Sequence, residues 1–387
     1  MQRPEPRPNP APSELLKGFL LHDDLLVRET VAFYFYESWS EDEDLIPLLL
    51  EGCRRFGEEA TLGTLGLGAR FPVSEEGLLD AVSELERSQP PLVEGWLARA
   101  PLELIARYED RLRPVLSSSA TARIERRRIL RGTATSDLWQ MLAAYAAHLD
   151  AEPCDDDGWK ELGDLLEALS MRETRAAVVE KILGLERLSS PTHRRSLIEL
   201  AGAMKLHEAT RVLVDLLGDP DDALAEEAAE SIGRLHALGS IRMIEDRYAE
   251  RPWAFRLYAI CALQTLKFAH SDAVLRSLLD KEEEPALRGR IFDALRFHFS
   301  AEAAELIRSE LHEPTSWMMP EELRKALFVH AQVLGREDPE AEAFRRDLDD
   351  AGDDGVFFRI PVMEWIEGPD PCPCGSGKRW QACCGAC

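Results

Sequence analysis

The chain has 387 residues, of which 45% are apolar and 30% charged, and its formal net charge is −25 at pH 7. Such an acidic balance argues against a general nucleic-acid binder, because neutralising phosphates requires a surplus of Lys and Arg. Leu, Ala, Glu and Arg dominate while β-branched runs are scarce, and this composition favours helices over strands.

The first residues, MQRPEPRPNPAP, are rich in proline and lack the apolar stretch that a signal peptide requires. Residues 1–12 are therefore predicted to be a disordered leader. No apolar run approaches the ~20 residues that cross a bilayer, so we expect no membrane insertion. A cytoplasmic location with reduced thiols follows, and there clustered cysteines indicate metal binding rather than disulfides.

Amphipathic helices are predicted from residue 13 onward. DDLLVRETVAFYFYES followed by EDEDLIPLLLEGCRRFG predicts a first helix pair. The next predicted helices are Glu75–Arg87, Leu92–Arg99, Leu102–Leu112, Thr135–Leu149, Trp159–Ser170 and Glu173–Leu185. Their spacing is irregular between Gln89 and Pro191, which leaves the number of units open there, and one interpretation places a bend near Pro153–Gly158.

A countable repeat occupies Ile198 to Leu311. Equivalent apolar positions are separated by 31, 31 and 32 residues, namely Leu213, Ile244, Leu275 and Ile307. A second series with the same spacings is Leu217, Tyr248, Leu279 and Leu311. Prolines that are expected to end one helix and begin the next recur as Pro220, Pro252, Pro285 and Pro314. One helix pair cannot bury both its faces, so the units are expected to stack.

The unit length and the DP-D-x-L and A-L-x-x-L patterns resemble short bacterial HEAT repeats, of the kind seen in phycobiliprotein-lyase-like proteins. In the first helix pair, Asp24, Val27, Arg28 and Ala32 occupy positions where HEAT repeats carry Asp, Val-Arg and Ala. The resemblance implies an all-α fold: a HEAT-like α-solenoid of stacked helix pairs over residues 13–350, clearest over 198–311.

Two dipeptides on this scaffold could be taken for metal ligands. His207-Glu208 resembles the His-Glu dipeptide of HEAT-type deoxyhypusine hydroxylases, but the equivalent positions are Leu238-Gly239 and Ala269-His270, so a di-iron centre is not expected. His22-Asp23 is also isolated and is predicted to lie in a turn. No GxSxG elbow, P-loop or dinucleotide fingerprint is present, which favours a non-enzymatic role.

The segment TARIERRRILRGTAT is the one strongly basic stretch of the sequence. At 3.6 residues per turn, Arg123, Arg127 and Arg131 share a helix face, and Arg126 and Arg128 flank it. The cluster could recognise phosphate or an acidic partner. We favour pairing with acidic residues of neighbouring helices. The isolated thiols Cys53, Cys154 and Cys261 are expected to be small buried residues.

The C-terminal sequence PDPCPCGSGKRWQACCGAC holds four cysteines with ligand spacing: Cys372, Cys374, Cys383 and Cys384. Two pairs of thiols joined by a short loop satisfy tetrahedral zinc coordination. Gly375 and Gly377 allow the backbone to turn and to direct N–H groups at the sulfurs, while Lys378 and Arg379 partly offset the net charge of the site.

This stretch closely resembles the SEC-C motif, the zinc-binding tail named for the protein-translocase motor SecA. The resemblance covers residues 369–387 and implies one structural Zn²⁺ held by those four cysteines, with Cys387 as an additional thiol. Trp380, Gln381 and Ala382 dilute the basic run of the family. If SEC-C tails contact SecB or ribosomes through that basic surface, this difference puts those partners in doubt here. Residues 351–368 are predicted to be an apolar connector that attaches the tail to the last helix pair.

The favoured function is a non-enzymatic adaptor that binds protein partners through its solenoid surface and its zinc knuckle. One alternative is a lyase-like or enzyme-associated HEAT protein with a pocket in the solenoid groove. Another is a ribosome- or RNA-associated factor, suggested by the tail and the arginine cluster. The sequence identifies neither the partner nor the pathway nor the oligomeric state.

Overall fold

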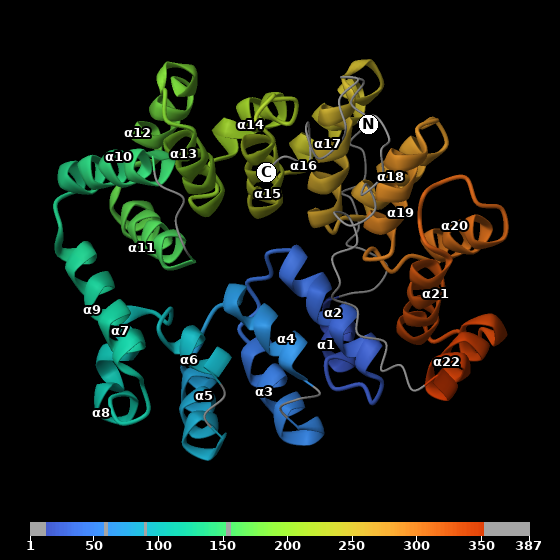
Figure 1. Ribbon diagram of the computed structural model, residues 1–387, viewed down its shortest axis with the longest axis horizontal. Helices are drawn as coiled ribbons and strands as arrows, with labels where there is room; N and C mark the ends of the chain where they lie inside the picture. The colour runs from blue at the N-terminus through green and yellow to red at the C-terminus, as the bar shows by residue number, and fades with distance from the viewer. Residues whose placement is uncertain (1–12, 58–60, 89–90, 152–155, 352–387) are drawn as a thin grey trace, which may run out of the picture. The chain divides into compact units, whose positions relative to one another are not determined.

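The computed structural model confirms an all-helical fold for the part of the chain that it describes, and no strand occurs in that part (Figure 1). The described residues are 13–57, 61–88, 91–151 and 156–351. They form two compact units, an N-terminal unit, Ser13–Leu206, and a C-terminal unit that begins at His207. The leader, nearly all of the predicted connector and the cysteine-rich tail lie outside the described residues.

The N-terminal unit is built from short and medium helices joined by tight turns. The α-helices are α1 (Ser13–Phe19), α2 (Leu25–Glu37), α3 (Leu45–Phe56), α4 (Leu62–Leu67), α5 (Glu75–Ser88), α6 (Pro91–Leu97), α7 (Leu102–Arg107), α8 (Glu109–Leu112), α9 (Ser118–Gly132), α10 (Thr135–Ala151), α11 (Asp156–Arg172), α12 (Arg175–Ile182) and α13 (Pro191–Ala203), with 3-10 turns η2 (Gly68–Arg70) and η3 (Leu185–Arg187).

One continuous row of helices runs through the N-terminal unit. In this row α2 packs on α4, α4 on α6, α6 on α9, α9 on α11 and α11 on α13. Beside the row, α3 packs on α5, while α10 and α12 both pack on α13. In this row, helices that are not consecutive in the sequence lie next to one another.

Helix α2 illustrates how the sequence sets these elements. The Asp24 carboxylate caps the helix by accepting hydrogen bonds from the N–H groups of Leu26 and Val27, at 2.9 and 3.4 Å. Val27 and Ala32 are fully buried. Arg28 is only 3% exposed, and its guanidinium donates hydrogen bonds to two carbonyls of the preceding turn, those of His22 and Asp23.

The C-terminal unit contains the countable repeat. The α-helices are α14 (Thr210–Leu216), α15 (Asp222–Leu235), α16 (Leu238–Arg247), α17 (Trp253–Thr265), α18 (Ala269–Leu279), α19 (Pro285–Leu295), α20 (Ala301–His312), α21 (Pro320–Leu334) and α22 (Pro339–Ala351), with 3-10 turns η4 (His207–Ala209) and η5 (Tyr248–Glu250). Two rows alternate along the chain: α15 packs on α17 and α17 on α19, while α14 packs on α16 and α16 on α18. Beyond them α20 packs on α21 and α21 on α22.

The repeat positions read from the sequence fall at equivalent places in these helices. The first series lies in α14, α16, α18 and α20, and each member is fully buried, namely Leu213, Ile244, Leu275 and Ile307. In the second series Leu217, Tyr248 and Leu279 are also buried, whereas Leu311 is half-buried. The apolar positions that recur about every 31 residues in the sequence are therefore positions that pack in the core of successive helix pairs.

The turns within the helix pairs repeat as well. Lys205, His236 and Phe299 have left-handed backbones, with φ of 51°, 48° and 45°, and each lies eight positions before a member of the first series. The fourth equivalent position, Lys267, departs from this pattern, and Leu266 before it has φ −83° and ψ 87°. Three of the four turns thus reverse the chain in the same way.

The repeated prolines play three different parts. Pro285 stands in the first turn of α19, where its missing N–H costs no hydrogen bond, and Pro252 is the N-cap residue of α17. Pro220 precedes Asp221, whose side chain caps α15. For Pro314 only half of the expectation is confirmed. Helix α20 ends at His312, two residues before this proline, but α21 begins at Pro320, and residues 313–319 form a loop between the two helices.

One predicted helix was also wrong. Leu102–Leu112 is divided into α7 and α8 at Tyr108, whose backbone leaves the helical region at φ −113° and ψ 19°. The Tyr108 hydroxyl donates to the Glu75 carboxylate of α5, and Arg107 pairs with the same carboxylate at 2.6 Å. These contacts between elements hold Tyr108 and Arg107 against α5, which accounts for the interruption.

Candidate functional site

The predicted zinc ligands, Cys372, Cys374, Cys383 and Cys384, lie outside the described residues, as do Cys154 and Cys387. Within residues 13–351, leaving out the undescribed gaps, no group of three or more His, Cys, Asp and Glu side chains could hold a metal ion. Cys53 is buried, as expected, whereas Cys261 is only half-buried.

The two dipeptides considered as metal ligands have local structural roles. His207-Glu208 begins the 3-10 turn η4. His22 lies in the turn before α2, as predicted, where its Nδ1 accepts a hydrogen bond from the Asp24 N–H at 3.1 Å and its ring stacks on Phe19. Neither dipeptide is joined by further ligands among the described residues.

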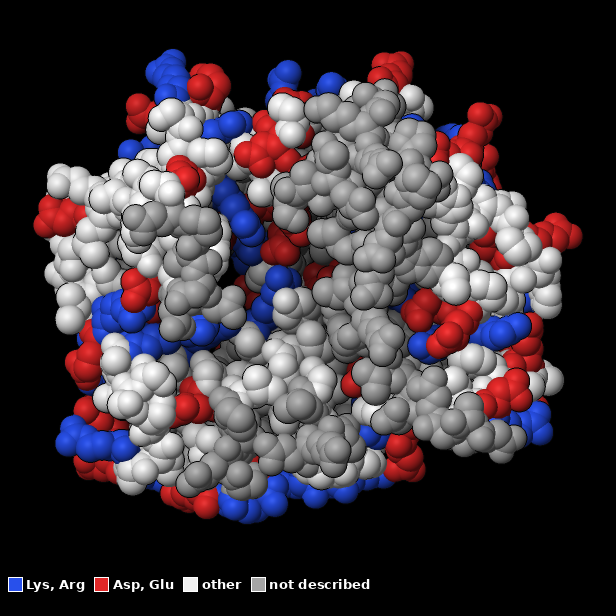
Figure 2. Space-filling model, in the orientation of Figure 1, with Lys and Arg blue, Asp and Glu red and all other residues white. Residues whose placement is uncertain are grey.

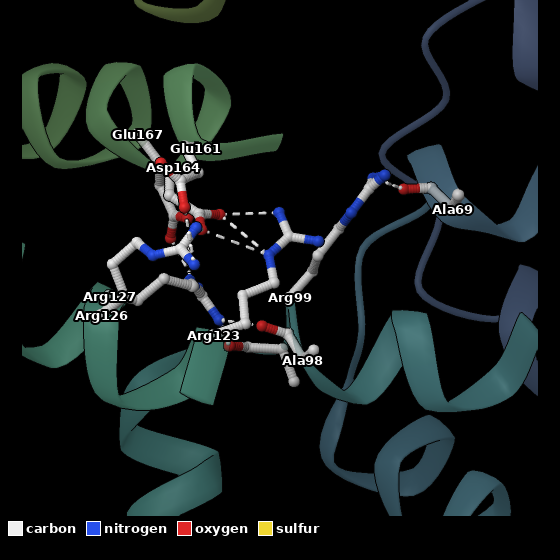
Figure 3. Close-up of polar contacts among 10 residues, drawn as sticks. Ala69, Ala98, Arg99, Arg123, Arg126, Arg127, Glu161, Asp164 and Glu167 are labelled. Atoms are coloured by element: carbon white, nitrogen blue, oxygen red, sulfur yellow. Dashed lines mark hydrogen bonds and ion pairs between the residues drawn. The ribbon is translucent and has the colours of Figure 1, made fainter. Parts of the chain in front are cut away.

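The basic segment forms α9, which begins after the capping residue Ser117. Figure 3 shows three of its arginines directed at α11. Arg123 donates from Nε and Nη2 to Oδ1 of Asp164, at 3.0 and 2.6 Å. Arg126 pairs with Glu161 at 2.9 Å and lies 3.8 Å from the same Asp164. Because Asp164 is only 2% exposed, these contacts cross-link α9 and α11 in a partly desolvated environment.

Arg127 is the most buried member of the cluster, at 4% exposure. It donates to Glu167 of α11 at 3.0 and 2.6 Å, and to the carbonyls of Ala98 and Ala100 at 2.8 and 2.9 Å. One guanidinium therefore holds together α9, α11 and the turn between α6 and α7.

Arg128 and Arg131 pair with acidic side chains as well. Arg128 contacts Glu125 and, at 3.5 Å, Glu109, while Arg131 pairs with Glu103 of α7. The prediction of pairing within the fold is confirmed for all five arginines. The five arginines are therefore already paired with carboxylates of the protein itself. This removes the basic cluster as an argument for nucleic-acid binding.

A residue that sequence reasoning missed lies beside this cluster. Arg99 follows α6, its side chain is exposed, and its Nη1 donates to the carbonyl of Ala69 (Figure 3). Among the described residues no carboxylate lies within ion-pair distance of Arg99. Although Arg99 reaches solvent, the surrounding protein partly desolvates its guanidinium and thereby lowers the pKa of Arg99. The positive charge of Arg123 lowers this pKa further, and the carboxylate of Asp164 acts in the opposite direction.

A second missed residue is Arg70, at the end of η2. Its guanidinium carbon lies 3.9 Å from the ring centroid of Tyr36 and 4.1 Å from that of Trp39. The two aromatic rings fix its orientation through cation–π contacts. No sequence signal could have linked Arg70 to Arg99, because they come from different helix pairs and share no motif.

The C-terminal unit has a small cavity of about 160 Å³ between α20, α21 and α22. Its charged lining residues face one another: Arg308 pairs with Asp338 at 2.5 Å, and Arg336 lies 4.0 Å from Glu305. His330 also lines it, and its Nε2 lies 3.0 Å from the carbonyl oxygen of Arg296. Burial lowers the pKa of His330 to about 4. The residues that line this cavity include no Ser, Thr, Cys or Lys that could act as a nucleophile.

Comparison with known protein families shows that the model of the SEC-C motif matches residues 369–386. The match includes all four predicted ligands, Cys372, Cys374, Cys383 and Cys384. Comparison with curated proteins finds no match to the chain. In the described part of the chain, no helix combines the length and the apolar character that crossing a membrane requires.

Proposed function

We propose that this protein is a non-enzymatic, cytoplasmic adaptor in which a HEAT-like α-solenoid offers a protein-binding surface and a zinc knuckle provides a second contact. The observation that carries the proposal is the SEC-C match over residues 369–386, with its four cysteines in C-x-C-x8-C-C spacing.

The chemistry of the tail supports a structural metal. Cys372, Cys374, Cys383 and Cys384 supply four thiolates, which complete a tetrahedral zinc site and leave no open position for a substrate. So short a segment has no hydrophobic core of its own, so the metal would supply its folding energy.

The regularity of the helices supports the HEAT-like part of the proposal. Successive helix pairs pack in rows, and the buried positions recur every 31 or 32 residues. In addition, a buried and a half-buried arginine donate hydrogen bonds to carbonyls of a preceding turn. Arg28 does this before α2, and Arg288 of α19 does it by donating to the carbonyls of Leu279 and Glu282, at 2.7 and 2.8 Å. Stacked repeats of this kind expose long surfaces suited to protein partners.

Elemental analysis of purified protein tests the metal site. We expect one zinc per chain, and we expect Cys374→Ser to release it, because a closed tetrahedral site cannot spare a ligand. Cys53→Ser and Cys261→Ser are the matched controls and should retain full zinc. A Cys374→Ser protein that keeps its zinc would show that the tail has been misinterpreted.

Affinity capture tests the adaptor role. Intact protein should retain a defined protein partner at moderate salt, and both Cys374→Ser and a chain ending at Gly368 should lose the part of that binding that depends on the knuckle. Recovery of nucleic acid that disappears as salt is raised would instead favour a ribosome- or RNA-associated factor.

A further inference from the structure

Three arginines of the N-terminal unit, Arg70, Arg99 and Arg123, are brought together from separate elements and are called here the arginine triad. They come from η2, from the turn after α6 and from α9, and both η2 and α9 pack on α6. The charges of Arg70 and Arg123 both act on Arg99. In the space-filling view, basic side chains gather over the part of this unit that holds α9 (Figure 2).

Each guanidinium of the triad is oriented by contacts with residues outside the triad. Arg70 lies against the rings of Tyr36 and Trp39, and Arg123 is bound by Asp164. Arg99 donates to the carbonyl of Ala69. A guanidinium has five N–H donors, so this one bond leaves Arg99 able to bind another acceptor.

No ion pair among the described residues neutralises the charge of Arg99. Asp164 is shared by Arg123 and Arg126, and the described residues provide no carboxylate for Arg99. Partial desolvation by the surrounding protein, together with the like charges of Arg123 and Arg70, lowers the pKa of Arg99. A pre-oriented guanidinium in such a position is stabilised by an incoming anion, and its planar fork matches a carboxylate.

We propose that Arg99, flanked by Arg70 and Arg123, binds a carboxylate of an acidic peptide segment in a protein partner. Asp164 provides an example within the fold, since its carboxylate is held by Nε and Nη2 of Arg123 and approached by Arg126. The net charge of −25 makes a long polyanion such as nucleic acid an unfavourable ligand, whereas a short acidic segment can be accommodated locally. This inference rests on the proposed adaptor function and names the chemistry of its partner.

Fluorescence anisotropy with the full-length, zinc-loaded protein tests the triad. The probe is a labelled octapeptide of alternating Glu and Gly, and the reference is the same peptide with Gln in place of Glu. Arg99→Gln should weaken binding of the Glu peptide about tenfold, since it removes a charge-assisted, two-donor contact. Arg99→Lys should recover only part of this loss, because it keeps the charge without the fork.

The matched control is Arg172→Gln in α11. Arg172 is also exposed, also donates from Nη1 to a backbone carbonyl (that of Arg131), and pairs with no carboxylate among the described residues. Its replacement should leave peptide affinity unchanged. Far-UV circular dichroism of each variant checks folding. As a charge-reversal test, Arg99→Glu should bind a peptide of alternating Lys and Gly if Arg99 is the residue that contacts the peptide.

Three outcomes overturn the inference: equal losses in Arg99→Gln and Arg172→Gln, equal binding of the Glu and Gln peptides, or tighter binding of a phosphoserine peptide than of the Glu peptide. The Cys374→Ser variant distinguishes failure of the adaptor function from failure of the arginine triad. Cys374→Ser should lose zinc yet bind the Glu peptide normally, because the triad lies in a unit that excludes the tail.

Discussion

Individual residues in the N-terminal unit are constrained by close packing as well as by charge. Gly68 at the start of η2 has ordinary backbone angles, φ −57° and ψ −16°. A Cβ atom at this position would lie 2.4 Å from Cζ2 and 2.6 Å from Cε2 of Trp96, a side chain that is 2% exposed. The requirement for glycine at this site is therefore one of space.

We expect Gly68→Ala to lower the free energy of unfolding by about 1–3 kcal/mol, because the rigid indole ring of Trp96 must shift to admit the methyl group. Gly66→Ala in α4 is the control, since nothing lies within 4 Å of its added Cβ. It should be neutral or stabilise the helix by up to about 1 kcal/mol. Urea denaturation of both variants checks the prediction, and equal stabilities would refute the packing argument.

Two buried histidines make the C-terminal unit sensitive to acid. His298 and His330 are 0% and 1% exposed, and burial lowers the pKa of both side chains, that of His330 to about 4. An unfolded histidine has its ordinary pKa of 6.5, so between pH 6.5 and 4 the unfolded chain binds more protons than the folded chain. This contribution to stability is fully present above pH 6.5 and is lost as the pH falls toward 4.

For His330 the loss should reach roughly 3 kcal/mol at pH 4, at about 1.4 kcal/mol for each unit of pKa difference. Urea midpoints measured from pH 7.5 to pH 4.5 check this expectation. His330→Gln, which does not titrate, should flatten the pH dependence of the midpoint. A variant whose midpoint depends on pH as steeply as that of the parent protein would exclude His330 as the source.

At the scale of elements, the turns between helices are as regular as the helices. Lys205, His236 and Phe299 adopt the left-handed conformation at equivalent repeat positions, although glycine or asparagine is the usual residue there. His236 is the C-cap of α15, and its N–H donates to the carbonyl of Gly233. At these three positions the left-handed residue ends one helix and turns the chain toward the next helix.

We expect His236→Val to lower the free energy of unfolding by at least about 1 kcal/mol, because a β-branched side chain cannot adopt this conformation without steric clash. His236→Gly is the matched control and should be tolerated much better, since glycine populates positive φ readily. Thermal melts monitored by circular dichroism compare the two. Equal destabilisation would mean that the imidazole contacts, and not the backbone, decide the cost.

At the scale of the whole molecule, the helical units and the cysteine-rich tail are expected to be energetically independent. Each unit is stabilised by neighbouring helices, and the last described helix, α22, ends at Ala351. Ending the chain at Gly368 should therefore leave the helical circular dichroism signal and the melting temperature nearly unchanged. Loss of cooperative melting in the truncated protein would show that the tail belongs to the fold of a unit.

Local sequence information accounts for the features that were predicted well. Helices such as α5, α10 and α11 were found because their apolar periodicity spans a few turns, and the 31-residue repeat was found because each unit packs in the same way. The errors at Tyr108 and Pro314 have a common physical cause. In both places contacts from another element influence the local conformation: Glu75 of α5 accepts a hydrogen bond from Tyr108, and Arg288 of α19 donates one to Thr315, next to Pro314.

The sequence by itself determined the all-helical character of the described chain, its repeat and the spacing of the four tail cysteines, since each of these depends on residues close together in the chain. Only the tertiary structure decided which charges meet. Asp164 is 41 residues from Arg123, and Arg70, Arg99 and Arg123 come from three elements. The rotation and register of the stacked helices bring such side chains together. This rotation and register are set by the burial of all the apolar helix faces at the same time, so they cannot be read from any single segment of the sequence.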